Sequence, residues 1–260
     1  MAYDGVALAK LIGERMRPLH IMAVRDCHST NDIVHEFFEG PASPEAVLAV
    51  ADFQRSGQGR QGRSWYSPEG KDVLMTLGLK RDRFALPQDP RLPLAVCVLV
   101  ARGIERATGV QPRPKWPNDL MDPEGRKLCG ILLRNRATHF AVGVGVNVNS
   151  RPEEFPEEIQ PRVSTLYALT GKSHDRSAIV AAVARELLDF FESCLAESLA
   201  DLVNQWLQHT VTFSHSLKLR SETGLHEVTP MRLIAETGEL VVRHQEGREE
   251  TLSSAKLIEP

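Results

Sequence analysis

The pattern of apolar residues predicts a sheet over the first two thirds of the chain. Four runs have the apolar content and length of strands: Val47–Gln54, Asp72–Lys80, Lys127–Leu133 and Phe140–Val148. The first two runs flank a loop rich in glycine and arginine. We therefore expect that loop to connect two neighbouring strands.

Helices are predicted where apolar residues recur every three or four positions. Ile33, Val34, Phe37 and Phe38 form one apolar stripe that follows the capping residues Ser29-Thr30-Asn31. Residues 92–108 are apolar on most faces and stop at Gly109, which predicts a buried helix with a glycine cap. Further helices are expected from Ser177 to about Ala196 and from Asp201 to His209.

The pattern changes after residue 210. From Val211 onward, short alternating segments are separated by Thr223-Gly224, Thr237-Gly238 and Glu246-Gly247, as in a small β unit. The sequence thus predicts a larger domain over residues 1–210 and a small β domain over residues 211–260.

Composition and charge narrow the class of protein. A chain of 260 residues can bury roughly 70–75% of its unfolded surface. The net charge of −3, with acids and bases interspersed, gives no basic field for a nucleic-acid backbone. The longest apolar stretch, Leu92 to Ala101, is too short to span a bilayer, and the N-terminus has no signal-type region. We expect a cytoplasmic protein that binds neither nucleic acid nor membrane.

Cysteine and histidine spacing shows no local metal or disulfide motif. Cys27, Cys97, Cys129 and Cys194 are scattered, as expected for reduced thiols. The nine histidines show no H-x-x-x-H or H-x-H arrangement, so no protein-borne metal site is predicted. Magnesium carried by a nucleotide remains compatible with the sequence.

The loop from Gly57 to Trp65 is the most informative segment. Its glycines allow close backbone approach to a ligand, and Arg60 and Arg63 offer forked donors for carboxylate or phosphate. Gly57, Gly59 and Gly62 also satisfy G-x-G-x-x-G, but Pro68 and Gly70 interrupt any following helix, which argues against a dinucleotide-binding fold. The loop alone fits an anion-binding site or a solvated basic turn equally well.

Two further clusters depart from ordinary strand and turn chemistry. In Lys115-Trp116-Pro117-Asn118-Asp119 the proline stiffens a turn that presents an amide beside a carboxylate, although an ordinary Asx turn would look the same. Lys127 stands at the mouth of a strand, and Gly130, Gly143 and Gly145 lie within strands, where glycine commonly marks close approach of a ligand. Together these departures predict one shared pocket.

Taken in order, these segments resemble biotin protein ligases. The resemblance covers Ser29-Thr30-Asn31, the 57–65 loop with Ser67-Pro68 and Gly70, and the segments 115–120, 127–132 and 143–147. It implies a fold of the α+β class, with a central mixed β-sheet flanked by helices, as in class II aminoacyl-tRNA synthetases, and a small C-terminal β-barrel of the Src-homology-3-like kind. It also implies an ATP-dependent ligase that forms biotinyl-5'-AMP and passes the biotinyl group to a lysine of a biotin carboxyl carrier protein or domain.

The resemblance further implies residue roles. Lys127 should lie beside the carboxylate and the α-phosphate, with Arg60 as a second catalytic cation. Asn118 should face the adenine, and Trp65 should wall in the nucleotide. The full set expected to bind biotin and ATP is Ser29, Thr30, Asn31, Gln54, Gly57, Gln58, Gly59, Arg60, Arg63, Trp65, Lys115, Asn118, Lys127, Gly130, Gly145 and Asn147.

Two departures from the family pattern stand out. Gln58 occupies a position that is commonly arginine, so anion stabilisation must fall on Arg60, Arg63 and Lys127. The C-terminal segment has Thr229-Pro230-Met231 where a glycine-containing strand is usual. Asp119 is the candidate base for the acceptor lysine, or it only orients Asn118 or Lys115.

Other interpretations stay open at this point. A lipoate-type protein ligase uses the same chemistry on a related scaffold, and a non-catalytic adenine-nucleotide sensor would have the pocket without the reaction. The 28 residues before Ser29 are too few for the winged-helix domain of repressor-type relatives, so DNA binding is not expected. A homodimer is neither predicted nor excluded.

Overall fold

A mixed seven-stranded sheet forms the centre of the computed structural model, which describes residues 2–13, 18–41, 44–84, 88–192, 196–214, 216–221 and 224–253. The strand order is β1-β2-β3-β7-β6-β5-β4. In that order the strands are Leu19–Cys27, Ala46–Gln54, Val73–Lys80, His139–Val146, Lys127–Asn135, Asp119–Met121 and Arg113–Lys115. The β1–β2 pair is parallel and the other pairs are antiparallel. The mixed sheet expected from the resemblance is therefore confirmed.

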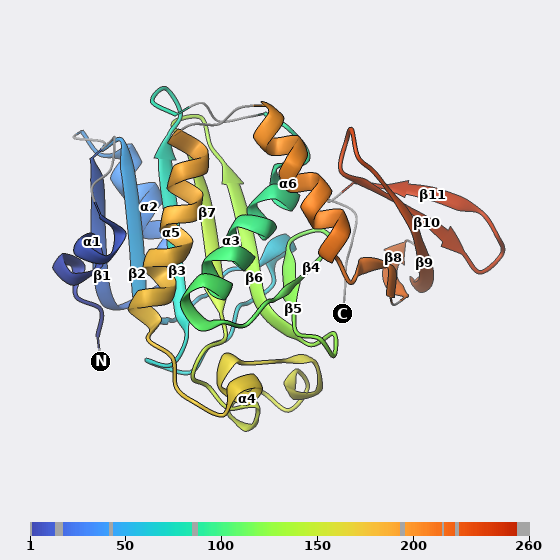
Figure 1. Cartoon of the computed structure of the whole chain (residues 1–260), viewed down its shortest axis with the longest axis horizontal. Helices are drawn as coiled ribbons and strands as arrows, with labels where there is room; N and C mark the ends of the chain where they lie inside the picture. Colours follow the sequence, from blue (N-terminus) through green and yellow to red (C-terminus); the bar gives the residue numbers. More distant parts are fainter. Residues whose placement is uncertain are drawn as a thin grey trace.

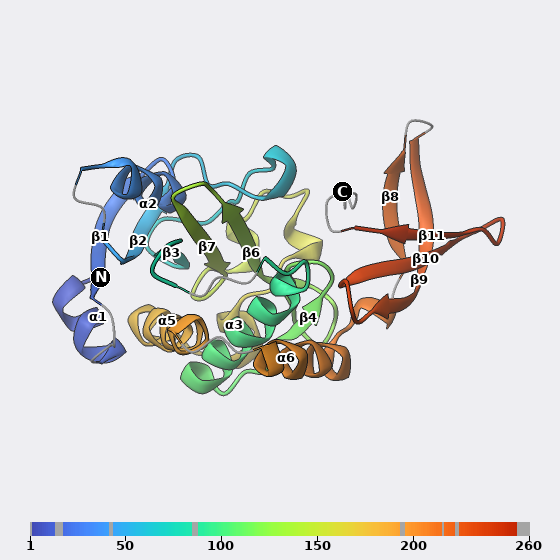
Figure 2. The same ribbon diagram turned by 90° about the horizontal axis from the view of Figure 1, so that it is seen from above.

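Helices cover both faces of this sheet (Figures 1 and 2). One face carries α1 (Gly5–Ile12), α3 (Leu92–Thr108), α5 (Arg176–Glu192) and α6 (Ala196–His209), and the other carries α2 (Thr30–Glu39). The short α4 (Leu166–Thr170) and the 3-10 turns Pro152–Glu154 and Gln160–Arg162 follow β7.

The largest core lies between the sheet and the four-helix face. Helix α3 is apolar on most faces because it is buried against the sheet, α5 and α6, and it ends at Gly109 in the left-handed conformation, as predicted. On the other face, Ser29 is the N-cap of α2, and its hydroxyl accepts a hydrogen bond from the backbone N–H of Asn31. This cap fixes the end of α2 that carries Thr30 and Asn31.

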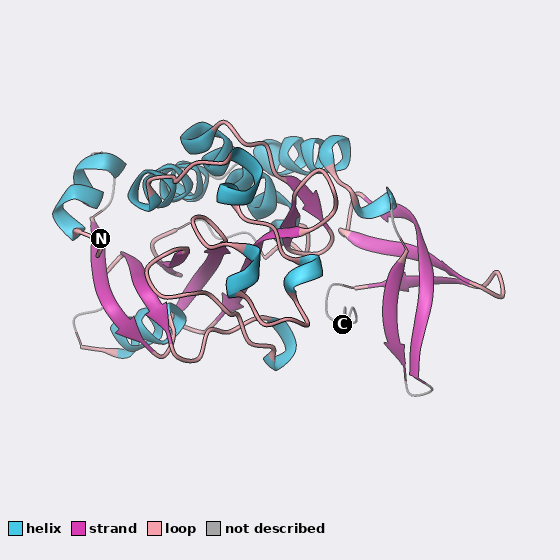
Figure 3. Cartoon of the chain, turned by 90° about the horizontal axis from the view of Figure 1, so that it is seen from below, coloured by secondary structure: helices cyan, strands magenta, loops and turns pink. Residues whose placement is uncertain are grey.

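The C-terminal segment forms a separate four-stranded antiparallel sheet at one side of the molecule (Figure 3). Its strands are β8 (Leu217–Ser221), β9 (Gly224–Ile234), β10 (Glu239–His244) and β11 (Glu249–Leu252), in the order β11-β10-β9-β8. The 3-10 turn Thr212–Ser214 leads into it from α6. The small all-β unit predicted after residue 210 is present, and residues 254–260 lie outside the described part.

The sequence pattern missed several elements and misplaced the end of one helix and the start of the next. Helix α6 begins at Ala196 rather than Asp201, and α5 ends at Glu192, with 193–195 outside the described residues. Helix α1, the edge strand β1, the hairpin β4–β5 and α4 were not predicted. Among the described residues, no helix has the length and apolar character needed to cross a membrane.

Candidate functional site

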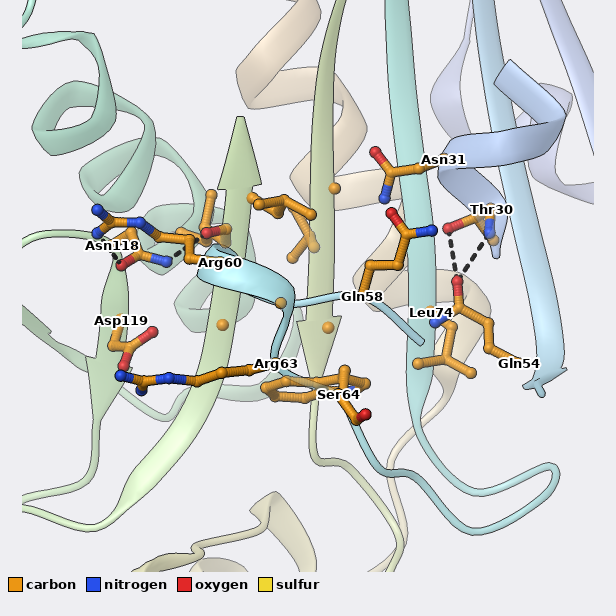
Figure 4. A pocket seen from close by; sticks show the side chains of 18 of the residues that line it. Thr30, Asn31, Gln54, Gln58, Arg60, Arg63, Ser64, Leu74, Asn118 and Asp119 are labelled. Atoms are coloured by element: carbon orange, nitrogen blue, oxygen red, sulfur yellow. Dashed lines mark hydrogen bonds between the residues drawn. The ribbon is translucent and has the colours of Figure 1, made fainter. Parts of the chain in front are cut away.

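One cavity lies over strands β3, β7 and β6, between the N-terminus of α2 and the turn that joins β4 to β5 (Figure 4). The glycine-arginine loop crosses over it. Three cationic side chains, Arg60, Arg63 and Lys127, line the cavity against a single carboxylate, Asp119. The cavity is therefore suited to an anionic ligand.

At the α2 end the cavity wall is polar and neutral. Gln54 Oε1 accepts the backbone N–H and the hydroxyl of Thr30 at 2.8 and 3.0 Å (Figure 4). The Thr30 hydroxyl also contacts Thr76 Oγ1 at 2.8 Å. Beside them, Asn31 Oδ1 is buried with no hydrogen-bond partner. This end thus holds an ordered set of amide and hydroxyl groups with one acceptor still unsatisfied.

The glycine-arginine loop closes on itself as a tight turn. The backbone N–H of Trp65 donates to the Gly57 carbonyl at 2.8 Å, and that of Gly59 donates to the Arg63 carbonyl at 2.7 Å. A Cβ on Gly57 would lie 2.4 Å from the Trp65 carbonyl oxygen, so only glycine fits there. The loop starts no true helix, as expected, but it contains one 3-10 turn, η1 (Arg60–Gly62).

Trp65 fills the space above the strand glycines. A Cβ on Gly145 would lie 2.5 Å from Trp65 Cε2, and one on Gly130 would lie 2.7 Å from its Cζ3. The indole therefore rests against the backbone of β6 and β7, with the Lys127 ammonium 5.7 Å from the ring centroid. The sequence predicted that these glycines make room for a ligand; in the structure the group they accommodate is Trp65.

The stiff turn predicted at residues 115–119 joins β4 to β5 and contains a cis peptide bond between Trp116 and Pro117. Asn118 Oδ1 accepts a hydrogen bond from Arg60 Nη1 at 3.0 Å, and its amide nitrogen donates to the Ile131 carbonyl. The loop, the turn and β6 are thus connected through one asparagine.

Asp119 and Lys127 form an ion pair inside the cavity. Lys127 Nζ lies 2.8 Å from Asp119 Oδ2, while Asp119 Oδ1 is buried and has no hydrogen-bond partner. The lysine side chain keeps 38% of its surface exposed. Behind it, the Asn147 amide donates to the carbonyls of Lys127 and Ser164, so Asn147 holds the start of β6 in place.

Gln58 is paired with an arginine from another element. Its Oε1 accepts a hydrogen bond from Arg134 Nη2 at 2.8 Å, and its amide nitrogen lies 3.4 Å from Asp32 Oδ1. A guanidinium from β6 therefore stands next to the position where the family usually has an arginine. Nothing in the sequence indicated this contact, because 76 positions separate the two residues.

Among the residues that the structure describes, those lining the cavity include neither a cysteine nor a histidine. Cys129 lies nearby on β6, but burial, followed by the charge of Asp119, raises the pKa of its thiol well above its usual range. Burial and the raised pKa thus disfavour a thiolate at Cys129, and the polar groups that line the cavity are ammonium, guanidinium, amide, hydroxyl and carboxylate groups.

Most of the expected site residues line the cavity. Those that do are Thr30, Asn31, Gln54, Gln58, Gly59, Arg60, Arg63, Trp65, Asn118, Asp119, Lys127, Gly130 and Gly145. Four do not: Ser29 caps α2, Gly57 closes the loop, Asn147 supports Lys127, and Lys115 is absent from the lining. The first three thus support residues around the cavity, and their contact with biotin or ATP stays a prediction.

Gly143 also lines the cavity, as the glycines within strands predicted, and sequence reasoning missed eight lining residues: Gln61, Ser64, Leu74, Met75, Pro117, Ile131, Leu132 and Val144. Several of them lie on β3, β6 and β7 beside residues that were predicted. Their apolar side chains had the ordinary signature of a sheet core, so only the register between strands could have assigned them to the cavity.

Comparison with known proteins shows the family to which this chain is similar. A profile of the "Biotin/lipoate A/B protein ligase family" matches residues 23–149. The chain is 30% identical over 224 residues to the "Bifunctional ligase/repressor BirA" of Bacillus spizizenii. The aligned region covers 84% of this chain and 68% of that protein. It is also 30% identical over 179 residues to the "Biotin--[acetyl-CoA-carboxylase] ligase" of Mycobacterium tuberculosis, covering 67% of this chain and 64% of that one.

A solved structure shows the same fold. The biotin protein ligase from Aquifex aeolicus in complex with biotin and ATP superposes with a TM-score of 0.70 at 28% identity, covering 92% of this chain and 97% of that one. The chain belongs to the biotin/lipoate A/B protein ligase family. The Mycobacterium tuberculosis and Aquifex aeolicus proteins are both named as biotin ligases, so the resemblance seen in the sequence is confirmed.

Proposed function

We propose that the protein joins biotin to a lysine of a biotin carboxyl carrier protein or domain in two steps. An oxygen of the biotin carboxylate first attacks the α-phosphorus of ATP, which forms biotinyl-5'-AMP and releases pyrophosphate. The lysine amine then attacks the acyl carbon, which forms an amide and releases AMP and a proton. The observation that carries this proposal is that Arg60, Asn118 and Lys127, from three separate segments, line one cavity.

The two ends of the cavity suit the two substrates. The hydroxyl and amide groups of Thr30, Gln54 and Asn31 offer neutral hydrogen bonds to the biotin head, and the unsatisfied Asn31 Oδ1 fits an N–H donor of the ureido ring. Trp65 and Leu74 supply apolar surface next to them. The turn with Asn118 lies at the opposite end, which we assign to the nucleotide (Figure 4).

Between these ends the cations serve the first step. Two anions must approach each other, and Lys127 with Arg60 and Arg63 offsets the charge that builds up on the phosphate in the transition state. Arg134, which donates to Gln58, adds a positive charge near the position that lacks the usual arginine. Lys127 reaches this position while paired with Asp119, so its ammonium is already oriented before substrate binds.

The second step requires a free amine. With a reference pKa near 10.4, only about one lysine in two to three thousand is unprotonated at pH 7. Asp119 is placed to help, because Oδ2 accepts from Lys127 while Oδ1 is buried without a partner. We propose that Oδ1 takes a proton from the incoming lysine ammonium, which leaves the free amine that then attacks the acyl carbon.

The remaining assignments follow from the same chemistry. ATP enters as its magnesium complex, and the ion belongs to that substrate. The relative named as an acetyl-CoA-carboxylase ligase supports a carboxylase carrier as partner. We place the protein in the cytoplasm, where ATP and carboxylases occur, and propose domains over residues 1–210 and 211–260.

The direct test is transfer in a lysate. With ATP and biotin present, we expect avidin-reactive labelling of one small set of proteins, with mass spectrometry placing biotin on a single lysine of each. Omission of ATP should abolish it. Absence of ATP-dependent labelling, with the cavity intact and ATP bound, would instead favour a nucleotide sensor.

A further inference from the structure

Three side chains that bind metals lie together on the parts of α2 and β7 that lead away from the cavity. His35 and Glu39 are one turn apart on α2, and His139 is the first residue of β7. One ring nitrogen of each histidine and one carboxylate oxygen all lie within 4.8 Å of one another. We propose that His35, Glu39 and His139 bind a divalent transition-metal ion of the zinc type.

The distances between the three ligand atoms suit such an ion after small movements of the side chains. Ligand atoms around a tetrahedral zinc with bonds of about 2.0–2.1 Å are about 3.4 Å apart. His35 Nδ1 and Glu39 Oε1 are 4.0 Å apart, and both side chains are about half exposed. They are therefore free to close on an ion, while the third ligand stays fixed.

His139 provides that fixed point. It is 2% exposed and stacks on Phe38, with ring centroids 4.7 Å apart. The Thr138 hydroxyl lies 2.9 Å from His139 Nδ1 and donates to Glu39 Oε1 at 3.1 Å. One hydroxyl thus holds two of the three ligands near each other, as outer-shell groups do in established metal sites.

The donor set selects the class of ion. Two imidazoles and one carboxylate are the ligands of open zinc sites, whereas calcium and magnesium prefer oxygen alone. The Glu39 carboxylate supplies a negative charge beside His139, which partly offsets the positive charges of Arg136 and Arg81. Three protein ligands leave a further position for water. The bound ion would connect α2 to the β6–β7 hairpin. Because these elements are far apart in the sequence, the search for local histidine motifs did not detect this cluster.

A titration of the full-length, tag-free chain tests the site. Calorimetry with Zn²⁺ should show one saturable site per chain, and His35→Ala and Glu39→Gln should each weaken it about tenfold or more. Because both residues are exposed, these variants should fold normally. His209→Ala, which removes an exposed histidine of α6, is the matched control and should bind as the wild type does.

A second probe distinguishes the ligands. Bound Co²⁺ should show visible d–d absorption without the near-ultraviolet band of a cobalt–thiolate bond. A thiolate band in the wild type would place the ion on a cysteine and overturn the proposal. Undiminished binding by His35→Ala, or no saturable binding by the wild type, would overturn it as well. None of these readouts depends on ligase activity.

Discussion

The indole N–H of Trp116 donates a hydrogen bond to the backbone carbonyl of Gly238 at 3.0 Å, and so joins the turn beside the cavity to the C-terminal sheet. The backbone N–H of Trp116 donates to Thr212 Oγ1 at 2.8 Å, in the segment that leads into that sheet. Trp116 is 1% exposed, and Asn118 is only two residues further along. The C-terminal unit thus contacts the turn that carries Asn118, the residue that we assign to the nucleotide.

We therefore expect Trp116→Phe to weaken nucleotide binding more than biotin binding. The change leaves the Gly238 carbonyl unsatisfied, at a cost of about 1–3 kcal/mol, and loosens the turn that positions Asn118. Steady-state kinetics should show a raised KM for ATP. Trp206→Phe is the control, because Trp206 is equally buried but its Nε1 has no hydrogen-bond partner. Equal effects of the two variants on the ATP KM would contradict this role.

Replacing Lys127 with alanine should abolish formation of the adenylate. The loss of the ammonium beside the reacting phosphate should lower the rate by about 10²- to 10³-fold. Because the lysine side chain is 38% exposed, the fold should persist, which circular dichroism and thermal unfolding can verify. Near-normal biotin-dependent pyrophosphate exchange in a folded variant would remove Lys127 from the mechanism.

Arg60→Gly should let the intermediate escape. The side chain connects the loop to Asn118 Oδ1, so its removal frees the loop that crosses over the cavity. Free biotinyl-adenylate then labels bystander lysines, which a blot of added serum albumin will detect. Arg60→Lys keeps the charge and should leak less. If the glycine variant labels only its carrier, the loop does not act as a lid.

Gly145→Ala should disturb the site through Trp65. The added methyl group would lie 2.5 Å from Trp65 Cε2, so the indole must leave its place on β7. We expect a large fall in adenylate formation and a change in tryptophan fluorescence. Gly40→Ala, where the nearest atom would be at 3.5 Å, should leave both unchanged. An unaltered fluorescence spectrum for Gly145→Ala would show that Trp65 is not held there.

The sequence predicted those parts of the fold whose pattern is local. Strands such as Val73–Lys80 and the buried helix α3 are apolar enough to be recognised without their neighbours. Strand β1 was missed because it lies at the sheet edge and mixes charged with apolar residues, and β4 and β5 have only three residues each. Such elements are buried by tertiary contacts, which the spacing of apolar residues along the sequence does not reveal.

The same limit applies to the site. The glycine-arginine loop, the turn at residues 115–119 and Lys127 were predicted to share a pocket, and residues from all three line one cavity. Glycine within a strand indicates that something approaches closely, but not that Trp65 does. The contacts of Gln58 with Arg134 and of Trp116 with Gly238 join residues 76 and 122 positions apart, so no local motif carries them.

Biotin-dependent exchange of labelled pyrophosphate into ATP by the purified chain is the most direct test of the central claim. The account predicts exchange that requires biotin, is lost in Lys127→Ala, and is not supported by lipoate. Exchange with lipoate but not biotin, or ATP binding without any exchange, would contradict it.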